Sequence, residues 1–563
     1  MRNRDWYVAD FETTTENYYL KEGCVKVWLW AICDSNAKIV ANGDSIDSFF
    51  KEVFDKKYKG SIIYFHNLKF DGNFILSWLL NNNYEYKDKI KVNDYGKFSC
   101  LIDDMGAFYT IKVVVSKRIW IEFYDSLKLL PYSEKQIAED FELPIKKGEI
   151  DYSDYTIDEE RLSYVNNDVQ IVAMALSIIK QNGFNKMTTA SSCYSTYKGM
   201  ISDMQYQAWF PELSDEFLDN YREAYRGGRS MVNPRFANKI LSNVKRYDVN
   251  SMYPYVMRSC KLPYGLPMRL NEPNKYAFEL YKIEVEFVLK QGCLPSLLRK
   301  GGIFGDSTYY EDSGGVITLY ISNIDFELLN RNYDILYLNY LEIWGFHTSK
   351  MMFRDYVDKY YQLKQTHKGA QRMCYKLYLN CLYGKCGSNH RGCHKVPRLE
   401  NGVVKFEDSE EENMKKYYLP LAIAITSYAH KILDDAIHET GIDKFVYCDT
   451  DSVHTLGDLP VGLIDNKELG KFKLESIEKR SKYIRQKCYV VEEPNGKITI
   501  TCAGMPDKLK EIVIKEHKDD IFDIFEEGFK VSGKLAPKRV KGGVLLSETT
   551  FEIKRRKNVL LDK

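Results

Sequence analysis

The chain has 563 residues, with 80 Lys and Arg against 79 Asp and Glu, so its formal net charge is +1. That length predicts about three to five domains. A hydrophobic fraction of 44% with 28% charged residues excludes a disordered or fibrous chain. The neutral total shows no basic excess of the kind that nucleic-acid-binding proteins carry, although it does not say where the charges lie.

Cysteine usage predicts a reducing compartment. The count of 13 is odd and no C-x-x-C pair occurs, so neither a disulfide framework nor a zinc ribbon is indicated. Met1 to Asp5 leads directly into a strand-like segment without the apolar region of a signal peptide. The best apolar run, Leu419 to Ile425, is far shorter than a bilayer requires. We therefore expect a cytosolic protein with no membrane span.

The first part of the chain, 1–189, is predicted to be an α/β unit. Strand-like runs such as Trp6 to Phe11 and Ile119 to Tyr124 are mixed with helical patterns. The polar segment Thr188 to Ser192 is predicted to be a linker into a second region.

Four acidic residues in this unit are candidate metal ligands. Asp10 and Glu12 stand two apart on a predicted strand, so they share one face. Asp71 follows, and Tyr164 and Asp168 share a helix face at i and i+4. Converging carboxylates need cations to neutralise them, and two divalent ions would activate a water that Tyr164 orients for phosphodiester hydrolysis. Each acid taken alone would be interpreted as an ordinary surface carboxylate, and only the set of four favours a metal site.

The region from 352 to 386 is predicted to form two helices joined near His367 to Gly369, as an antiparallel hairpin. Lys376, Asn380 and Tyr383 are at i, i+4 and i+7 and are predicted to share one helix face. Lysine can pair with phosphates, and tyrosine can stack on a base. A plain amphipathic surface helix is the alternative.

A second set of acids flanks this hairpin in the sequence. Asp248 follows a strand-like segment, and Asp449 and Asp451 stand two apart where an apolar strand is predicted to turn sharply. One acid from one strand and two from a neighbouring turn can hold two Mg²⁺ ions, and phosphoryl transfer needs little more than this positioning and charge neutralisation.

These motifs resemble known families. The D-x-E at 10–12, the N-x-x-F-D at 67–71 and the Y-x-x-x-D at 164–168 resemble the DnaQ-like 3′–5′ exonucleases. The segments 248–254, 376–384 and 447–452, with Lys487-Cys488-Tyr489, resemble motifs A, B, C and K-x-Y of family B DNA polymerases. The segments 64–72, 225–228 and 502–508 are similar to the protein-primed family B DNA polymerases of the phage phi-29 type, and the similarity covers nearly the whole chain.

The resemblance implies an α/β and α+β multidomain fold, in which an RNase H-like exonuclease precedes a right-hand polymerase with two terminal-protein-region insertions. The implied domains are the exonuclease (1–189), the palm in two parts (190–260 and 418–527), terminal-protein region 1 (261–351), the fingers (352–387), terminal-protein region 2 (388–417) and the thumb (528–563). The second insertion would be a β-rich loop that closes a ring around DNA and so supports processivity and strand displacement.

The resemblance also implies site residues. The polymerase metals would be held by Asp248, Val249, Asp449 and Asp451, and the exonuclease metals by Asp10, Glu12, Asp71 and Asp168, with Tyr164 and Lys147 as further catalytic residues. The nucleotide would contact Tyr253, Lys364, Lys376, Asn380 and Tyr383. DNA would contact Tyr64, His66, Asn67, Phe70, Phe74, Ser126, Leu127, Tyr225, Gly227, Gly228, Lys487 and Tyr489.

The implied function is protein-primed, template-directed, strand-displacing DNA synthesis with 3′–5′ proofreading, for a small linear phage genome. Its cofactor would be Mg²⁺, two ions per active site, with Mn²⁺ as a substitute. Its partners would be template and primer DNA, the displaced single strand, dNTPs and a terminal protein that forms a heterodimer with an otherwise monomeric enzyme in the bacterial cytoplasm. The alternative is a 3′–5′ exonuclease whose C-terminal region binds DNA without synthesis. A second rival is an architectural single-strand-binding protein, and the clustered acids argue against it.

Two further sequence patterns, a group of cysteines and histidines and two basic segments, have roles that depend on the tertiary structure. Cys381, Cys386, His390, Cys393 and His394 resemble a zinc cluster, but their spacing matches no usual paired-ligand pattern and an incidental grouping is favoured. The segment 530–563 carries 10 basic and 3 acidic residues, and 479–487 holds five cations and no acid. Both are predicted to contact DNA phosphates.

Overall fold

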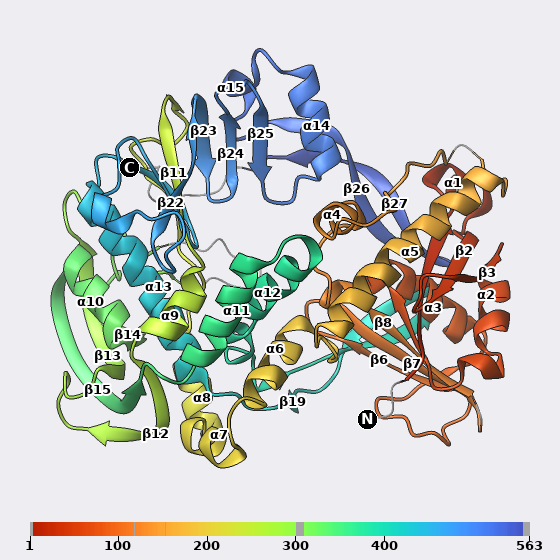
Figure 1. Cartoon of the computed structure of the whole chain (residues 1–563), viewed down its shortest axis with the longest axis horizontal. Coiled ribbons are helices and arrows are strands. Elements are labelled where there is room, and N and C mark those ends of the chain that lie inside the picture. The colour runs from red at the N-terminus through yellow and green to blue at the C-terminus, as the bar shows by residue number, and fades with distance from the viewer. Residues whose placement is uncertain (1–3, 118, 153, 300–308, 555–563) are drawn as a thin grey trace.

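The computed structural model describes residues 4–117, 119–152, 154–299 and 309–554. Its N-terminal unit is built on an eight-stranded sheet in the order β3-β2-β1-β4-β8-β7-β6-β5 (Figure 1). The strands are β1 (Trp6–Thr13), β2 (Val27–Asp34), β3 (Ile39–Gly43), β4 (Ile62–Phe65), β5 (Glu85–Tyr86), β6 (Lys97–Ile102), β7 (Phe108–Ser116) and β8 (Ile119–Asp125). The predicted strands at 6–11 and 119–124 are therefore confirmed.

Helices cover both faces of this sheet. They are α1 (Glu16–Glu22), α2 (Ile46–Val53), α3 (Leu68–Asn81), α4 (Glu134–Asp140) and α5 (Glu159–Gln181). The apolar residues of α3 pack into one core and those of α5 into another, with alternate β1 residues on each side. Seven of the eight residues of β2 are buried, as expected for a strand that is covered on both faces.

Helix α5 is, among the described residues, the one helix long and apolar enough by composition to cross a membrane. Half of its most apolar stretch is buried within the protein. Its contacts with β1 and β2 make it a core helix of the α/β unit.

The predicted linker at 188–192 is wrong. Helix α6 (Thr189–Lys198) begins there, because the Thr188 side chain caps it by accepting a hydrogen bond from the Ser191 backbone N–H. A Thr/Ser-rich segment can thus mark a helix start as well as a loop. Helices α7 (Asp203–Trp209) and α8 (Asp215–Tyr221) follow.

The second region is centred on a five-stranded sheet in the order β22-β11-β21-β20-β9. Its strands are β9 (Ser230–Val232), β11 (Val244–Val249), β20 (Phe445–Asp449), β21 (Ser452–Thr455) and β22 (Phe472–Glu478). Helices α9 (Met252–Ser259) and α13 (Leu419–Thr440) pack beside it. Asp248 is the second-last residue of β11 and Asp449 is the last residue of β20, and Thr450 has a positive φ of 59° in the turn between β20 and β21.

The segment predicted as the first insertion, 261–351, folds around a separate core. A four-stranded sheet in the order β12-β15-β13-β14 comprises β12 (Leu262–Leu270), β13 (Phe278–Leu289), β14 (Ile317–Ser322) and β15 (Tyr333–Ser349), with α10 (Asn323–Asn332) against it. Part of this segment, 300–308, lies outside the described residues.

The helical hairpin is confirmed as α11 (Arg354–Thr366) and α12 (Gly369–Cys381). Lys376 and Asn380 lie on α12, but Tyr383 does not. Tyr383 starts a short 3-10 turn that ends at Lys385, because the helix tightens after Leu382 in a stretch that contains Gly384 and Gly387. The prediction that all three side chains belong to one helix face is therefore wrong for Tyr383.

The segment 388–417 is β-rich, as predicted. Its strands form two hairpin pairs, β16 (Arg391–Gly392) with β19 (Glu412–Asn413) and β17 (Lys395–Glu400) with β18 (Val403–Asp408). The inner pair contacts α3 of the N-terminal unit.

The C-terminal part contains a four-stranded sheet in the order β10-β23-β24-β25. Three of its strands are consecutive in the chain, β23 (Arg480–Arg485), β24 (Cys488–Glu492) and β25 (Ile498–Cys502), and the edge strand β10 (Ile240–Leu241) comes from an earlier segment. Helices α14 (Asp507–Glu516) and α15 (Ile521–Ile524) lead to a long hairpin of β26 (Lys530–Val540) and β27 (Gly543–Glu552). Figure 1 shows this hairpin reaching from the C-terminal part to the N-terminal unit.

The tip of the β26–β27 hairpin docks on two other regions. The Val25 backbone N–H donates to the Lys541 carbonyl at 3.0 Å, and a Cβ at Gly543 would lie 2.5 Å from the ring of Phe74. The Arg539 guanidinium lies 4.6 Å from the centre of the Phe406 ring on β18. The N-terminal unit, the 388–417 segment and the hairpin therefore contact one another in a closed circuit.

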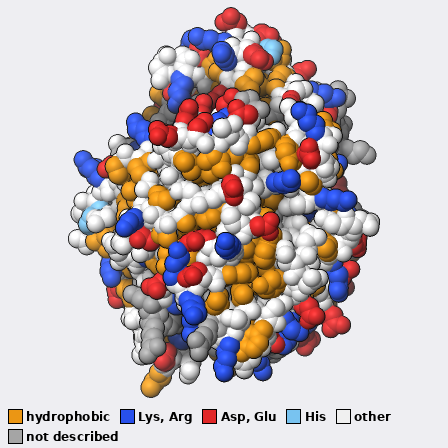
Figure 2. Space-filling view, turned by 90° about the vertical axis from the view of Figure 1, so that its right-hand side faces the viewer, with side chains coloured by type: hydrophobic (Ala, Val, Ile, Leu, Met, Phe, Trp, Pro, Cys, Tyr) orange, Lys and Arg blue, Asp and Glu red, His pale blue; other side chains and the backbone are white. Residues whose placement is uncertain are grey.

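Charge is interspersed on the outer face of the N-terminal unit. Figure 2 shows acidic and basic side chains mixed among apolar ones on this face, without a large area of one sign.

Candidate active sites

The first carboxylate site lies between β1 and α5. Oxygen atoms of Asp10, Glu12 and Asp168 lie within 4.8 Å of one another. The first two share a face of β1 because they stand two apart, and Asp168 approaches from the third turn of α5 with 1% of its surface exposed. The convergence predicted for these three acids is confirmed in geometry.

Asp71 joins the site from the first turn of α3, where it is 3% exposed. Burial, followed by the charges of nearby acids, raises the pKa of Asp10 and of Asp71 well above the ordinary range. The same cause raises the pKa of Glu12 to about 7 and that of Asp168 to about 6. Four acids so placed repel one another unless positive charge lies between them.

Lys147 and Tyr152 hold two of these acids in place. The Lys147 ammonium donates to Asp168 at 2.7 Å and also contacts Glu134, and it lies 5.4 Å from the centre of the Tyr164 ring. The Tyr152 hydroxyl donates to Glu12 at 2.9 Å. Lys147 and Tyr164 thus lie at the site as predicted. Glu134 and Tyr152 were not predicted, because no local sequence pattern indicates a role for them.

The residues predicted to hold a frayed strand are only partly accessible. Asn67 is exposed at the start of α3 with a left-handed backbone, and Phe70, His66 and Leu127 are half-buried near it. His66 is held between Ser126 (2.9 Å) and the Tyr132 carbonyl (2.8 Å), and burial lowers its pKa.

Tyr64, Phe74 and Ser126 are buried and are not placed to grip a strand. Tyr64 is 3% exposed and its hydroxyl accepts a hydrogen bond from Lys180, while Phe74 packs beneath the hairpin tip at Gly543. Ser126 is fully buried against the Phe65 carbonyl. The prediction of direct strand contacts by these three side chains is not supported, since alternate strand positions and the inner face of α3 point into the core.

The second carboxylate site lies at the ends of β11 and β20. Asp248 pairs with Ser452, which also pairs with Asp449, so the predicted acids are brought to one edge of the sheet. The Val249 N–H donates to the Asp451 carbonyl at 2.8 Å and ties the two strand ends together. The Val249 side chain is apolar and buried, so only its carbonyl oxygen can serve as a ligand.

Electrostatics at this second site parallel those of the first. The Asp451 side chain keeps contact with solvent but is partly desolvated by the protein around it. This desolvation, together with the negative charges of Asp248 and Asp449, raises the pKa of Asp451 to about 6. Burial also raises the pKa of Asp248, whose nearest cation is Arg246 at 3.6 Å.

An aromatic wall adjoins these acids. The rings of Tyr253, on the first turn of α9, and Tyr383 stack with centroids 4.2 Å apart and an interplanar angle of 29°. Both side chains are half-buried, so part of the stacked pair remains exposed beside the carboxylates. The two tyrosines are therefore brought together as a pair although they lie 130 residues apart in the sequence.

Cations from the helical hairpin face the same place. Lys364 on α11 donates to the Ser251 hydroxyl at 3.0 Å. Burial, together with the charges of Arg372 and Lys376, lowers the pKa of Lys364 to about 8. Lys376 and Asn380 are exposed on α12. Ser251 lies in the segment 248–254 that resembles motif A, whereas Arg372 is a further member of this group that local patterns did not reveal.

The 225–228 segment touches the second site directly. A Cβ at Gly228 would lie 2.8 Å from the Thr450 hydroxyl, and the Gly227 carbonyl accepts a hydrogen bond from His430 Nε2 at 2.6 Å. Tyr225 packs so closely on Gly387 that a Cβ there would lie 2.6 Å from its ring. These residues thus connect the turn that carries Asp449 and Asp451 to the base of the 388–417 segment.

The K-x-Y residues flank the same turn. Lys487 is exposed and its ammonium lies 3.6 Å from Asp449, while its backbone N–H donates to the Tyr447 hydroxyl at 3.1 Å. The half-buried Tyr489 ring packs 5.3 Å from that of Tyr447. Both residues lie beside the acids as predicted.

The prediction that all five cations of 479–487 contact phosphates is wrong. Lys479 and Arg480 both pair with Glu492, at 2.7 and 2.6 Å, and Lys482 is buried and donates to the Phe522 carbonyl. The acid partner comes from the adjacent strand β24, which a charge count along the sequence does not reveal. In 530–554, by contrast, Lys534 and Lys538 are on the exposed hairpin, and 555–563 lies outside the described residues.

Both sites fit divalent cations. One oxygen each of Asp71, Asp168 and Asp248 is buried without a hydrogen-bond partner among the described residues. A buried carboxylate oxygen without a donor is costly, and hard divalent ions prefer such oxygen ligands. The ligand sets would be Asp10, Glu12, Asp71 and Asp168 at the first site, and Asp248, Asp449, Asp451 and the Val249 carbonyl at the second.

The group of cysteines and histidines at 381–394 does not converge. Among the described residues it supplies no three-ligand set, apart from His394, which clusters with two acids from elsewhere. His390 instead lies near Asp215 and Asp219 of α8. The expectation of an incidental grouping agrees with this placement.

Comparison with known proteins identifies close relatives. The family described as DNA polymerase type B, organellar and viral, matches residues 55–156 and 153–458. The DNA polymerase of Bacillus phage phi29 is 36% identical over 98% of this chain and 99% of its own length, and that of Streptococcus phage Cp-1 is 32% identical over 98% of each.

Among solved structures, the Phi29 DNA polymerase in an orthorhombic crystal form has a TM-score of 0.90 at 34% identity, covering 98% of this chain and 100% of that one. This likeness confirms the predicted fold class, an exonuclease unit joined to a palm, fingers and thumb. The metal-fitting acids and the adjacent cations lie on this shared framework.

Proposed function

The chain belongs to the type B DNA polymerases of the organellar and viral kind, and from that premise we propose that it is a protein-primed, strand-displacing replicase with 3′–5′ proofreading that copies a small linear phage genome. Its substrates are template and primer DNA and dNTPs, as in the Phi29 DNA polymerase complex with primer-template DNA and incoming nucleotide substrates, which has a TM-score of 0.87 at 35% identity.

The second carboxylate site is the observation that best supports DNA synthesis as an activity of this protein. Asp248, Asp449 and Asp451 meet at one sheet edge, with an Asp248 oxygen that accepts no hydrogen bond from the described residues and the cations of the helical hairpin opposite. Two bound Mg²⁺ ions, with Mn²⁺ as a substitute, supply charge neutralisation for attack of the primer 3′-hydroxyl on the α-phosphate of a dNTP. Lys364 and Lys376 hold the triphosphate as point charges.

The stacked pair of tyrosines selects the nucleotide. Tyr253 lies against the sugar of the incoming nucleotide and excludes a 2′-hydroxyl, while Tyr383, with Asn380, borders the nascent base pair. The 4.2 Å stack supports these roles because each ring limits the movement of the other. Lys487 and Tyr489, which flank Asp449, hold the primer terminus.

Proofreading is assigned to the first carboxylate site. There Asp10, Glu12, Asp71 and Asp168 bind divalent ions, Tyr164 orients a water, and Lys147 holds Asp168 in place. Asn67, Phe70 and Leu127 border the frayed strand, which Tyr225, Gly227 and Gly228 guide between the sites. The exposed Asn67 and the contact of Gly228 with the Thr450 turn support this route.

Strand displacement and processivity follow from the closed circuit of contacts. The exonuclease (1–189), terminal-protein region 2 (388–417) and thumb (528–563) enclose the DNA, with the Arg539–Phe406 contact as one junction. Enclosed template cannot easily dissociate, and a passage too narrow for duplex separates the strands. The palm (190–260 and 418–527), the fingers (352–387) and terminal-protein region 1 (261–351) complete the assignment.

At initiation the enzyme, otherwise a monomer, pairs with a terminal protein whose hydroxyl accepts the first nucleotide. It is phage-encoded and acts in the bacterial cytoplasm, as the phage origin of its relatives supports.

Primer extension tests the proposal. Asp449→Ala and Asp451→Ala should abolish synthesis and leave digestion of a 3′ single strand intact, whereas Asp10→Ala with Asp168→Ala should do the reverse. Retained synthesis in the first pair would refute the assignment and would favour an exonuclease with a DNA-binding C-terminal region. Transfer of a labelled dNMP to a candidate terminal protein then tests protein priming separately.

A further inference from the structure

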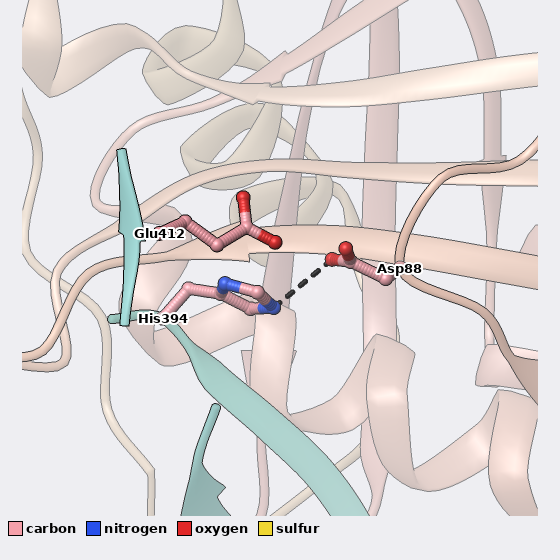
Figure 3. A group of neighbouring side chains, drawn as sticks. All are labelled: Asp88, His394 and Glu412. Carbon is pink, nitrogen blue, oxygen red and sulfur yellow. Dashed lines mark ion pairs between the residues drawn. The ribbon is translucent and has the colours of Figure 1, made fainter. Parts of the chain in front are cut away.

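Three potential metal ligands that belong to neither active site meet at a junction between the N-terminal unit and the 388–417 segment. Asp88 follows β5 in the N-terminal unit, His394 precedes β17, and Glu412 lies on β19 (Figure 3). One ligand atom from each lies within 4.8 Å of the other two, and Asp88 Oδ1 is 3.0 Å from His394 Nε2. None of the three has a part in the proposed polymerase or exonuclease chemistry.

The surroundings of His394 determine which ring nitrogen faces the acids. Its side chain is nine-tenths buried. Its backbone N–H donates to the Ser409 hydroxyl at 3.0 Å, and its carbonyl accepts from the Ser409 N–H at 2.8 Å. This double connection holds the imidazole with Nε2 directed toward Asp88 and Glu412, as Figure 3 shows.

The hydrogen bonds of Ser409 also determine where the imidazole proton lies. The Ser409 hydroxyl lies 2.8 Å from the Glu410 carbonyl and 3.1 Å from Nδ1, and it has one hydrogen; when that hydrogen is donated to the carbonyl, Nδ1–H is the donor to Ser409. In the neutral ring Nε2 then carries a lone pair, and it faces a carboxylate oxygen at 3.0 Å. Two facing lone pairs require a cation between them, either a proton or a metal ion.

We propose that Asp88, His394 and Glu412 bind a divalent transition metal of the zinc type. Zinc takes His nitrogen and carboxylate oxygen at about 2.0–2.2 Å in tetrahedral geometry, which places its ligand atoms about 3.3 Å apart. The Asp88–His394 pair is already close to that spacing, and the Glu412 carboxylate reaches it by side-chain rotation. Water would complete the site, since Asp88 is exposed.

Nearby groups are compatible with this assignment. The Tyr86 hydroxyl lies 3.3 Å from Nε2, and Lys89 reaches Glu412 at 3.7 Å with an ammonium that is mostly in solvent. A bound ion would displace the loose Lys89 contact at little cost, because exposed ion pairs contribute about 0–1 kcal/mol. The Nδ1–H bond to Ser409 is the outer-shell contact that metal-bound histidines usually have.

The bound ion would fasten the 388–417 segment to the N-terminal unit. That consequence for the ring rests on the proposed function, but metal binding itself does not. Magnesium does not compete well, because hard ions avoid nitrogen ligands, whereas zinc accepts them. Excess Mg²⁺ can therefore occupy the all-oxygen active sites while zinc is offered to this one.

The experiment measures retained zinc. Full-length protein stripped with a chelator is given one equivalent of Zn²⁺ in excess Mg²⁺, passed through gel filtration and analysed for metal. The wild type should retain one zinc per chain, and His394→Ala and Glu412→Gln should retain none. Glu410→Gln, which changes a neighbouring exposed acid outside the cluster, should retain it.

Two further variants keep the test decisive if His394→Ala folds poorly. Asp88→Asn alters an exposed ligand and should lose the zinc. Ser409→Ala should weaken zinc binding about 10- to 100-fold, as loss of an outer-shell partner does. A zinc-dependent rise in the melting temperature should accompany binding and should vanish in the ligand variants. Equal zinc retention by wild type and the ligand variants, or no zinc in the wild type, would overturn the proposal.

Discussion

Lys364 should make nucleotide use depend on pH. Its ammonium is held against Ser251 at 3.0 Å, and burial with the charges of Arg372 and Lys376 lowers its pKa to about 8. Only the charged form can pair with a triphosphate. Because a lowered lysine pKa means loss of charge on raising the pH, kcat/KM for the dNTP should fall as the pH rises through about 8.

The size of the effect follows from that value. With a pKa of about 8, the charged fraction of Lys364 falls from about 90% at pH 7 to about 10% at pH 9, so kcat/KM should fall roughly ninefold. Lys364→Arg stays charged throughout this range and should change less than about twofold. Lys376→Gln removes a neighbouring charge, so the fall should move to higher pH even though overall binding weakens.

The assay is single-nucleotide primer extension at limiting dNTP, with an Asp10→Ala background that removes digestion of the primer. The ratio of wild type to Lys364→Arg at each pH cancels effects of pH on the substrate. Parallel profiles for the two proteins would refute the reasoning, and so would a Lys376→Gln profile that moves to lower pH.

Three other changes test separate parts of the molecule. Tyr152→Phe removes a hydrogen bond to a carboxylate of the first site and should lower the exonuclease rate about tenfold or more, by gel assay, without changing synthesis. Asp434→Asn leaves the fully buried Arg229 without its 2.6 Å partner and should cost about 3–5 kcal/mol, seen as a lower melting temperature. Phe406→Ala removes the ring beneath Arg539 and should shorten products per binding event while single insertions stay unchanged.

Each of these has a contradicting outcome. Equal loss of synthesis and digestion in Tyr152→Phe would indicate a folding defect. For the buried ion pair, the double change Asp434→Leu with Arg229→Met should destabilise less than Asp434→Asn, and a larger loss would reject an unpaired charge as the cause. Unchanged product length in Phe406→Ala would show that this junction does not help to enclose DNA.

Local spacing determined where chemical groups would lie on each element. Asp10 and Glu12 share a strand face, and Tyr164 and Asp168 share a helix face, because these relations depend only on the two- and 3.6-residue periods of the backbone. The turn after Asp449 was also evident, since an apolar strand stops at clustered acids. These short-range features sufficed to propose both carboxylate sites, whereas the fold class followed from the resemblance of the motifs to known families.

Tertiary packing decided which of those groups are available. Tyr64 and Phe74 match a strand-binding pattern but lie in the core, and the cations Lys479 and Arg480 are paired with Glu492 from the next strand. The stack of Tyr253 on Tyr383 depends on chain segments that approach only after folding.

The neutral net charge illustrates the same limit. The sequence alone determines that 80 basic and 79 acidic side chains balance, which argues neither for nor against a nucleic-acid partner. Only the fold decides that acids converge at two sheet edges, that Lys364 and Lys376 face one of them, and that Asp88 meets His394 across 306 residues of chain. Coulomb interactions act over a few ångströms in space, and a sequence does not specify those distances.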